Sequence, residues 1–284
     1  MVKILSDSTC DLSQELLEKY DISILPLHIL LGEKEYCDGV DITPDEIFQW
    51  SDAQKTTPKT SAPALDMAME MLEPFVKEKQ PVICFSISED MSTSANVMRM
   101  AVSELEAEDL VTVIDSASLS TGIGLLVLHA AEMAQAGKTV EEIQTEIEEL
   151  KSKVRASFVV DTLLYLYRGG RCSGLAAMFG SALHLHPMIV VENGKMHSSK
   201  KYRGKLSKVI LDYAKDLKEQ MEQARSERVF ITHSGCSREI VESVRAYLTG
   251  LHHFDQVLET RAGSVISSHC GPGTLGVLFV RKEA

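Results

Sequence analysis

The chain has 284 residues, of which 44% are hydrophobic and 25% are charged, and this composition excludes a collagen-like, low-complexity or largely disordered protein. The formal net charge of −12 is unevenly distributed, because residues 1–150 hold nine Lys and Arg against 29 Asp and Glu, whereas residues 151–284 hold 20 against 12. The acidic first part disfavours nucleic-acid binding, since it repels phosphate. The basic second part favours an anionic ligand or an acidic partner.

Hydropathy and cysteine spacing limit the cellular context. No apolar run reaches the roughly 18–20 residues that a membrane helix needs, and the N-terminus is too polar after Leu5 for a signal peptide. Six scattered cysteines form no C-x-x-C pair and no zinc-ligand spacing with His, which is typical of reduced thiols. The sequence therefore predicts a soluble cytoplasmic protein with no membrane span, no structural metal and no nucleic-acid partner.

The first part of the chain alternates apolar runs typical of strands with amphipathic segments typical of helices. We expect strands at 2–5, 22–31, 81–87 and 110–114, and helices at 44–50, 64–79, 92–105 and 121–136. Pro26 indicates that the second of these strands is an edge strand or contains a bulge. The alternation predicts a parallel sheet with helices on both faces, and a ligand site at the carboxyl ends of its strands. The loops expected there, 6–9, 86–94 and 115–121, are rich in Ser and Thr.

One short motif superficially resembles a nucleotide site. Gly137-Lys138-Thr139 looks like the end of a phosphate-binding P-loop, but position 132, where that loop needs glycine, is Glu. Thr139 and Glu142 instead have the spacing of a capping box, which predicts the start of a helix.

After Lys153 both the charge and the pattern of elements change, which predicts two domains, 1–154 and 155–284. Strands are expected at 154–160, 188–191, 229–232, 257–260 and 275–280, with helices around 163–166, 174–183, 205–223 and 238–248.

Several polar residues are candidates for ligand contacts. Ser and Thr cluster at 56–61, 86–94 and 116–121; singly they are typical helix caps, but together they would form a donor-rich surface suited to a carboxylate or phosphate. Two arginines flank a glycine pair in Arg168-Gly169-Gly170-Arg171, and His269 precedes a tight Gly-Pro-Gly turn. The basic residues between 195 and 208 form either a surface for partner docking or a solvated face.

The ordered set of motifs resembles the DegV family of bacterial fatty-acid-binding proteins over essentially the whole chain. The matching segments are Asp7-Ser8-Thr9-Cys10-Asp11-Leu12, Thr60-Ser61-Ala62-Pro63, Ile87-Ser88 with Met91-Ser92, Val113-Ile114-Asp115-Ser116, Arg168-Gly169-Gly170-Arg171-Cys172-Ser173-Gly174 and His269-Cys270-Gly271-Pro272-Gly273. The resemblance implies an α/β protein with a three-layer N-terminal domain built on a parallel sheet. A second α/β domain with a mixed or antiparallel sheet would complete a lipid tunnel.

The resemblance also implies a function. The protein would bind a long-chain fatty acid and present its carboxylate to a separate ATP-binding fatty acid kinase, which forms an acyl phosphate for phospholipid synthesis; it would need no nucleotide site or cofactor of its own. By position, Thr60, Ser61 and Ser92 would hold the carboxylate, with His269 and Arg171 near the head group. Arg203 falls in a basic segment implicated in kinase docking, with Lys201 and Lys205 beside it.

One loop departs from the family pattern. It reads Ser92-Thr93-Ser94-Ala95, where the family usually has Ser-Gly-Thr-Tyr, so we expect backbone strain at Thr93 and extra space near the head group. Two other functions stay open from the residues alone. The chain would be an acyl or phosphoryl hydrolase or transferase with Ser92 as nucleophile and His269 as base, or a regulatory module that binds a small polar ligand such as phosphate or sugar.

Overall fold

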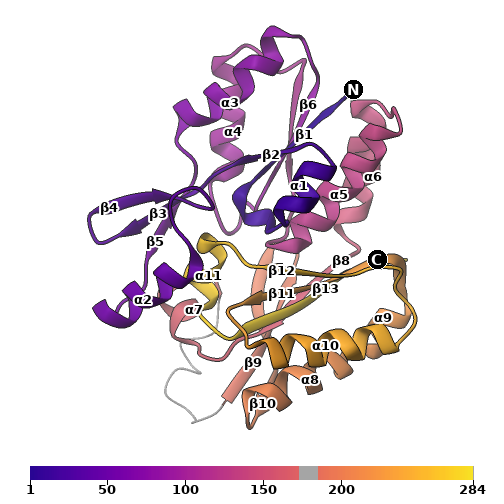
Figure 1. Cartoon of the computed structure of the whole chain (residues 1–284). Helices are drawn as coiled ribbons and strands as arrows, with labels where there is room; N and C mark the ends of the chain where they lie inside the picture. Colours follow the sequence, from indigo (N-terminus) through magenta and orange to yellow (C-terminus); the bar gives the residue numbers. More distant parts are fainter. Residues whose placement is uncertain (173–184, 284) are drawn as a thin grey trace.

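The computed structural model describes residues 1–172 and 185–283, and it contains three sheets (Figure 1). The helix expected at 174–183 lies outside the described residues. Within the described part of the chain, no helix is both long enough and apolar enough to span a bilayer.

The first sheet is parallel and sits between two helical layers. Its order is β2 (Ile22–Leu25), β1 (Lys3–Asp7), β6 (Val82–Ser86) and β7 (Val111–Asp115). Helices α3 (Leu65–Lys77) and α4 (Ser94–Glu104) cover one face, while α1 (Gln14–Lys19), α5 (Thr121–Gln135) and α6 (Val140–Lys151) lie on the other. The capping box of Thr139 and Glu142 starts α6, as the spacing predicts. The three-layer prediction is confirmed.

The apolar run 22–31 does not form one strand, because the chain changes sheet at Pro26. After β2, which is an edge strand, the chain enters a small antiparallel sheet of order β4 (Lys34–Cys37), β3 (His28–Leu31) and β5 (Lys59–Ser61). Helix α2 (Pro44–Gln54) packs beside it, and Ile29 and Ile47 are fully buried in a cluster that also includes Val265. We call residues 27–63 the inserted segment. Sequence analysis missed its sheet, because strands of three or four residues with charged side chains show little alternation.

The second sheet is mixed, as expected. Its order is β10 (Lys195–Arg203), β9 (Leu185–Glu192), β8 (Val154–Val159), β13 (Thr274–Arg281), β11 (Ala224–Ser234) and β12 (Val257–Arg261), and only the last pair is parallel. Helices α8 (Leu206–Asp216), α9 (Lys218–Glu222) and α10 (Arg238–Gly250) cover one face. The single helix predicted at 205–223 is wrong, because the chain divides at Leu217 into α8 and α9.

Helix α5 packs between the two large sheets, which explains why it is apolar all round. Eleven of its residues are buried, and the cluster around it includes Ile83 and Phe85 of the first sheet and Phe158 and Leu278 of the second. The division into domains 1–154 and 155–284 stays a prediction, because the two parts share this core.

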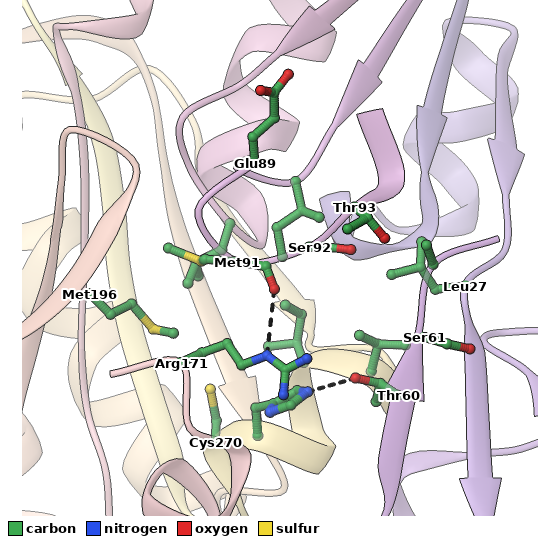
Figure 2. Close-up of a pocket in the computed structure, with 16 residues that line it drawn as sticks. Leu27, Thr60, Ser61, Glu89, Met91, Ser92, Thr93, Arg171, Met196 and Cys270 are labelled. Atoms are coloured by element: carbon green, nitrogen blue, oxygen red, sulfur yellow. Dashed lines mark hydrogen bonds between the residues drawn. The ribbon is translucent and has the colours of Figure 1, made fainter. Parts of the chain in front are cut away.

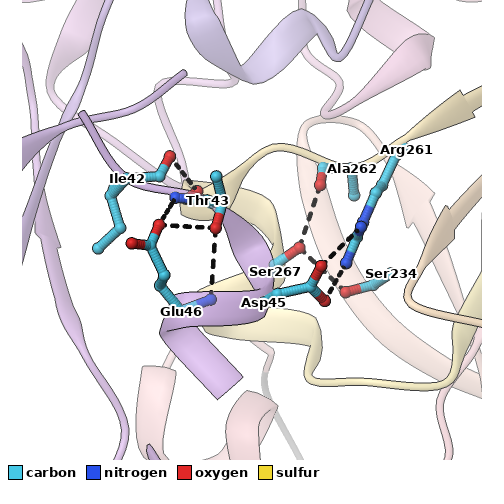
Figure 3. Close-up of polar contacts among 9 residues, drawn as sticks. Ile42, Thr43, Asp45, Glu46, Ser234, Arg261, Ala262 and Ser267 are labelled. Atoms are coloured by element: carbon cyan, nitrogen blue, oxygen red, sulfur yellow. Dashed lines mark hydrogen bonds and ion pairs between the residues drawn. The ribbon is translucent and has the colours of Figure 1, made fainter. Parts of the chain in front are cut away.

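An ion pair ties the inserted segment to the second sheet. Thr43 and Glu46 form a capping box at the start of α2, and the adjacent Asp45 accepts two hydrogen bonds from Arg261 at the end of β12, at 3.1 and 2.5 Å (Figure 3). Both side chains are at least 40% exposed, so the pair orients α2 more than it stabilises the fold.

Candidate ligand-binding site

A cavity of about 500 Å³ lies where the first sheet, the inserted segment and the second sheet meet (Figure 2). Its polar wall consists of Thr60, Ser61, Glu89, Ser92, Thr93, Arg171 and His269. Its apolar wall consists of Leu27, Ala62, Ile87, Met91, Leu119, Met196, Val265, Ile266 and Cys270. This volume and this mixture suit a ligand with a long apolar part and one polar group.

Thr60 and His269 meet in the cavity although they are 209 positions apart. Thr60 lies in β5, and His269 lies near the end of α11 (Ser264–Cys270), a short helix that sequence analysis did not predict. Thr60 Oγ1 and His269 Nε2 are 2.7 Å apart. Burial, with the nearby charge of Arg171, lowers the pKa of His269 to about 4, so the imidazole is neutral at neutral pH.

The surroundings of the ring indicate which nitrogen carries the proton. His269 Nδ1 is buried without a hydrogen-bond partner among the described residues, and the α-carbon of Gly169 packs against it so closely that a Cβ there would lie 2.4 Å from Nδ1. A buried N–H without an acceptor is rarer than an unused acceptor, which favours the tautomer with hydrogen on Nε2. His269 then donates to Thr60 Oγ1, and the Thr60 hydroxyl hydrogen is free to bind an anion in the cavity.

Two buried carboxyl groups hold the start of α11. Asp11 accepts from the Gly263 backbone N–H at 2.8 Å and from Ser120 Oγ at 2.5 Å, and Asp38 accepts from the Ser264 N–H at 2.7 Å. Burial raises the pKa of Asp11 to about 8 and also raises the pKa of Asp38. Sequence analysis quoted Asp11 only as part of a family motif and did not identify Asp38. Both residues position His269 through its helix.

Ser92 lies in a loop after β6 that hydrogen bonds hold at several points. Asp7 accepts from the Ile87 N–H at 2.8 Å, and the Ser88 N–H donates to the Ser118 carbonyl at 2.9 Å. Ser92 Oγ lies 2.8 Å from Ser94 Oγ, at the N-terminus of α4. The hydroxyl therefore faces both the helix end and the cavity, an arrangement that favours a negative charge nearby.

The expected strain at Thr93 is absent. Thr93 has φ −90°, which any residue adopts, so the loop holds Thr where the family usually has Gly without a backbone penalty. Ala95 is fully buried.

Arg171 brings a positive charge to the cavity. Its Nε donates to the Met91 carbonyl at 3.5 Å and its Nη1 donates to the Gly169 carbonyl at 2.6 Å. The guanidinium therefore lies between the Ser92 loop and His269 (Figure 2). Among the described residues it pairs with no carboxylate, whereas Glu89, the other charged lining residue, pairs with Arg99 at 2.5 Å. The cavity therefore has an unpaired positive charge at its polar end.

The structure separates the other predicted hydroxyls from this group. Thr60 and Ser61 are adjacent in β5, so their side chains leave on opposite faces, and in Figure 2 the Ser61 hydroxyl points away from Thr60. Ser8 and Ser120 are hydrogen-bonded to the buried Asp38 and Asp11, and neither lines the cavity. Many of the loop hydroxyls thus serve buried carboxyl groups rather than a ligand.

One side of the cavity is formed by the β9–β10 hairpin. Met196 of β10 lines the cavity, and the hairpin turn is held because Ser88 Oγ donates to the Gly194 carbonyl at 2.7 Å. Gly194 has φ +78°, and a Cβ there would lie 2.7 Å from Ser88 Oγ, so both conformation and space require glycine. Lys195 and Asp90 add an exposed ion pair at 3.5 Å.

The residues predicted to dock a partner lie away from the cavity, at the other end of β10. Lys201 and Arg203 are exposed on this edge strand, and Lys205 is the exposed N-cap of α8. In the described part of the chain, none of the three pairs with a carboxylate. From Met196 to Arg203 the strand spans roughly 23 Å at about 3.3 Å per residue.

The geometry disfavours the two alternative functions. Ser92 is bonded to Ser94 and His269 to Thr60, so the nucleophile–base hydrogen bond of a hydrolase is missing, and the low pKa of His269 weakens it as a base. The largely apolar wall disfavours a small polar ligand. Within the described residues, no group of three His, Cys, Asp or Glu is placed to hold a metal ion.

Fold and site together define a class of protein: an α/β protein of two large sheets with a mostly apolar cavity that ends in hydroxyl, imidazole and guanidinium groups. The family described as "Uncharacterised protein, DegV family" matches residues 1–282, and the chain belongs to this family. A DegV domain-containing protein of Clostridium perfringens is 31% identical over 283 residues, 99% of each chain, and one from Clostridium acetobutylicum is 32% identical over the same length and coverage.

Solved structures agree with this assignment. A DegV family protein from Thermus thermophilus, described as fatty-acid binding, is 29% identical with a TM-score of 0.89, and a stearic acid-binding protein from Eubacterium ventriosum is 31% identical with a TM-score of 0.86. Each comparison covers 99% of both chains. The fold predicted from the sequence, and the family that it resembles, are confirmed.

Proposed function

We propose that the chain binds one long-chain fatty acid in this cavity, with the carboxylate between Thr60, Ser92 and Arg171 and the acyl chain along the apolar wall. The observation that carries the proposal is the pairing of a largely apolar cavity of about 500 Å³ with the Arg171 guanidinium at its polar end, which forms no ion pair with any residue that the structure describes. Each buried methylene contributes about 0.8 kcal/mol, so a long chain supplies most of the affinity. The polar groups limit the cost of removing the carboxylate from water.

Each polar residue has a distinct role in this proposal. Thr60 donates its hydroxyl hydrogen to the carboxylate because neutral His269 already satisfies its oxygen, and Arg171 supplies the opposite charge. Ser92 adds a second hydroxyl at the start of α4, whereas Ser61, whose hydroxyl points away from Thr60, takes no part in holding the carboxylate. His269 is a positioning residue that acts through Thr60.

We further propose that the bound acid is presented to a separate ATP-binding fatty acid kinase, which docks on Lys201, Arg203 and Lys205. The support is that Lys201 and Arg203 lie on a strand whose other end forms the cavity wall, with Lys205 just beyond it, and that all three are exposed and form no ion pair with any residue that the structure describes. The chain itself would supply the acyl substrate and no nucleotide site.

Native mass spectrometry of the purified protein, followed by organic extraction, tests the ligand. We expect a long-chain fatty acid at about one per chain. Removing a hydrogen bond to a charged group costs about 1.5–3 kcal/mol, so Thr60→Val and Ser92→Ala should each weaken palmitate or oleate binding roughly tenfold or more. Thr56→Val, at an exposed threonine outside the cavity, is the matched control. A protein that purifies empty and takes up neither acid would refute the proposal.

A further inference from the structure

A second hollow on the molecule contains two arginines that have no carboxylate partner. It is a groove of about 700 Å³ between the end of α6, the loop after β7 and the second sheet, and none of its residues lines the fatty-acid cavity. Arg155 and Arg281 lie in it, together with apolar residues that include Met188, Val190 and Phe279.

The register of the sheet places the two guanidinium groups on one face. Arg155 of β8 is directly opposite Phe279 of β13, and Arg281 follows Phe279 by two positions. Opposed residues share a face, as do residues two apart, so the arginines are diagonal neighbours on adjacent strands. At this spacing their side chains can reach one small ligand from two sides.

The two arginines form no ion pair within the described chain. Of eleven arginines, six form an ion pair with Asp or Glu, whereas Arg155 and Arg281 form none. Arg155 donates to the carbonyls of Ser152 and Val154, and Arg281 donates only weakly to Gln223, at 3.4 Å.

Both arginines are half-buried, and other charged residues lie in the same groove. Arg281 Nε is buried without a partner, and burial together with the charge of Arg281 lowers the pKa of Arg155. Lys151 is paired with Glu148 at 2.6 Å. Glu192 also lies in the groove, 3.4 Å from His197, and its charge partly offsets the effect of Arg281 on Arg155, although Glu192 forms no ion pair with either arginine. The groove thus holds two neighbouring cations that repel each other and are partly removed from water.

We infer that this groove binds a phosphate group between Arg155 and Arg281. A phosphate dianion can compensate both cations and offers oxygens to two guanidinium groups at once, whereas a single carboxylate carries one charge and two oxygens. The apolar residues beside the arginines leave room for an organic part, so the phosphate comes either as the free ion or as a monoester with an apolar body. This site is independent of the fatty-acid cavity and of the proposed function.

Phosphorus NMR and isothermal titration calorimetry of the full chain, with chloride at matched ionic strength, test the site. Inorganic phosphate and phenyl phosphate are the probes. We expect saturable binding that weakens at least about tenfold in Arg281→Gln and in Arg155→Gln, because each variant removes one charge-assisted contact. Arg238→Gln, which removes an exposed arginine outside the groove, should bind as the unaltered protein does.

Thermal denaturation gives a second, independent measurement. Relief of the repulsion between the two arginines should leave Arg281→Gln at least as stable as the unaltered protein in chloride, and phosphate should raise the Tm of the unaltered protein but not of the variant.

The two probes distinguish the source of the phosphate group. Tighter binding of phenyl phosphate than of inorganic phosphate identifies a monoester, and equal binding identifies the free ion. The inference is overturned if phosphate does not bind, or if both arginine variants bind it with undiminished affinity.

Discussion

The neutral imidazole of His269 connects the backbone at Gly169 to the proposed carboxylate site through Thr60. The pKa near 4 means that this residue orients a hydroxyl instead of carrying charge. Arg171 then provides the positive charge of the site, which divides orientation and charge between two residues.

The packing of Gly169 against His269 gives a prediction that leaves every polar group in place. Gly169→Ala places a methyl group 2.4 Å from Nδ1, so the ring must move and the Thr60 hydrogen bond must lengthen. We expect weaker fatty-acid binding, several-fold or more, measured by calorimetry. Gly250→Ala is the control, because a Cβ at Gly250 meets nothing within 4 Å. Unchanged affinity in Gly169→Ala would contradict the positioning role of His269.

The residues alone indicate the hydroxyl clusters, Arg171 and His269 as candidates, but only the family resemblance assigns them to one site. No spacing rule brings Thr60 to His269 across 209 positions, since that contact depends on how the inserted segment packs on α11. Asp11 and Asp38 are buried carboxyl groups, and composition predicts acidic side chains on the surface. The expected strain at Thr93 was wrong because the loop does not need a positive φ there.

At the scale of elements, the β9–β10 hairpin forms one wall of the cavity. β10 is an edge strand, and its turn is fixed to the Ser92 loop by the Ser88–Gly194 hydrogen bond and one exposed ion pair. The same loop carries Ser92 and the Met91 carbonyl that Arg171 contacts. Movement of the hairpin would therefore shift the loop that holds the head group of the ligand.

Loss of this contact should speed the exchange of ligand. Ser88→Ala removes a buried hydrogen bond worth about 1 kcal/mol, which corresponds to a roughly fivefold faster dissociation of bound fatty acid. Stopped-flow displacement of a fluorescent fatty acid measures this rate. Ser103→Ala, at an exposed serine of α4, should leave the rate unaltered. An equal rate in Ser88→Ala would mean that the ligand leaves by another route.

The hydrophobic pattern of the sequence predicts best those long helices and strands that are buried or keep one apolar face along their length. The parallel strands and helices α3 to α6 lie near their expected positions, because buried runs and amphipathic stripes are repeated over several turns. Three kinds of element were missed or misjudged: the short strands β4 and β5, the seven-residue α11, and the helix broken at Leu217. In each case the secondary structure depends on tertiary contacts, which local periodicity does not reveal.

At the scale of the whole molecule, we expect docking of the partner kinase and binding of the fatty acid to depend on different residues. We expect Arg203→Glu to reduce acyl-phosphate formation by the partner kinase at least about tenfold, because charge reversal replaces attraction with repulsion. Its affinity for fatty acid should stay unchanged, since Arg203 lies roughly 23 Å along β10 from the cavity. Arg238→Glu, at another exposed arginine, is the control. Equal loss of binding and phosphorylation would contradict a docking role.

The buried carboxyl groups make stability depend on pH. Asp11 has a pKa of about 8 in the fold, above its ordinary value, so the native state holds a proton that the unfolded chain has released. Stability therefore falls as pH rises through 8, and Asp7, with a pKa of about 6, and Asp38 act in the same direction. His269 opposes them, but only below about pH 6.5, because its folded pKa is lowered.

The clearest window is consequently between pH 6.5 and 8. There the free energy of unfolding should decrease by at most about 1.4 kcal/mol per pH unit for each proton released. Asp11→Asn, which preserves size and cannot ionise, should flatten this dependence in urea unfolding, while the exposed Asp109→Asn should not. An unaltered slope in Asp11→Asn would show that Asp11 is already ionised at neutral pH.

The inserted segment has one more consequence. It leaves the first sheet at Pro26, rejoins the main fold near Pro63, and forms a small hydrophobic cluster with Val265 of α11, and it contributes Thr60, Ser61 and Leu27 to the cavity wall. Substitutions within it can reshape the ligand site while the cores of both large sheets keep their packing. The rest of the wall offers less freedom, because Ile87, Met91 and Ile266 belong both to the cavity wall and to the core around α5. The inserted segment is thus the part of the wall where selection can alter ligand preference with the least effect on folding.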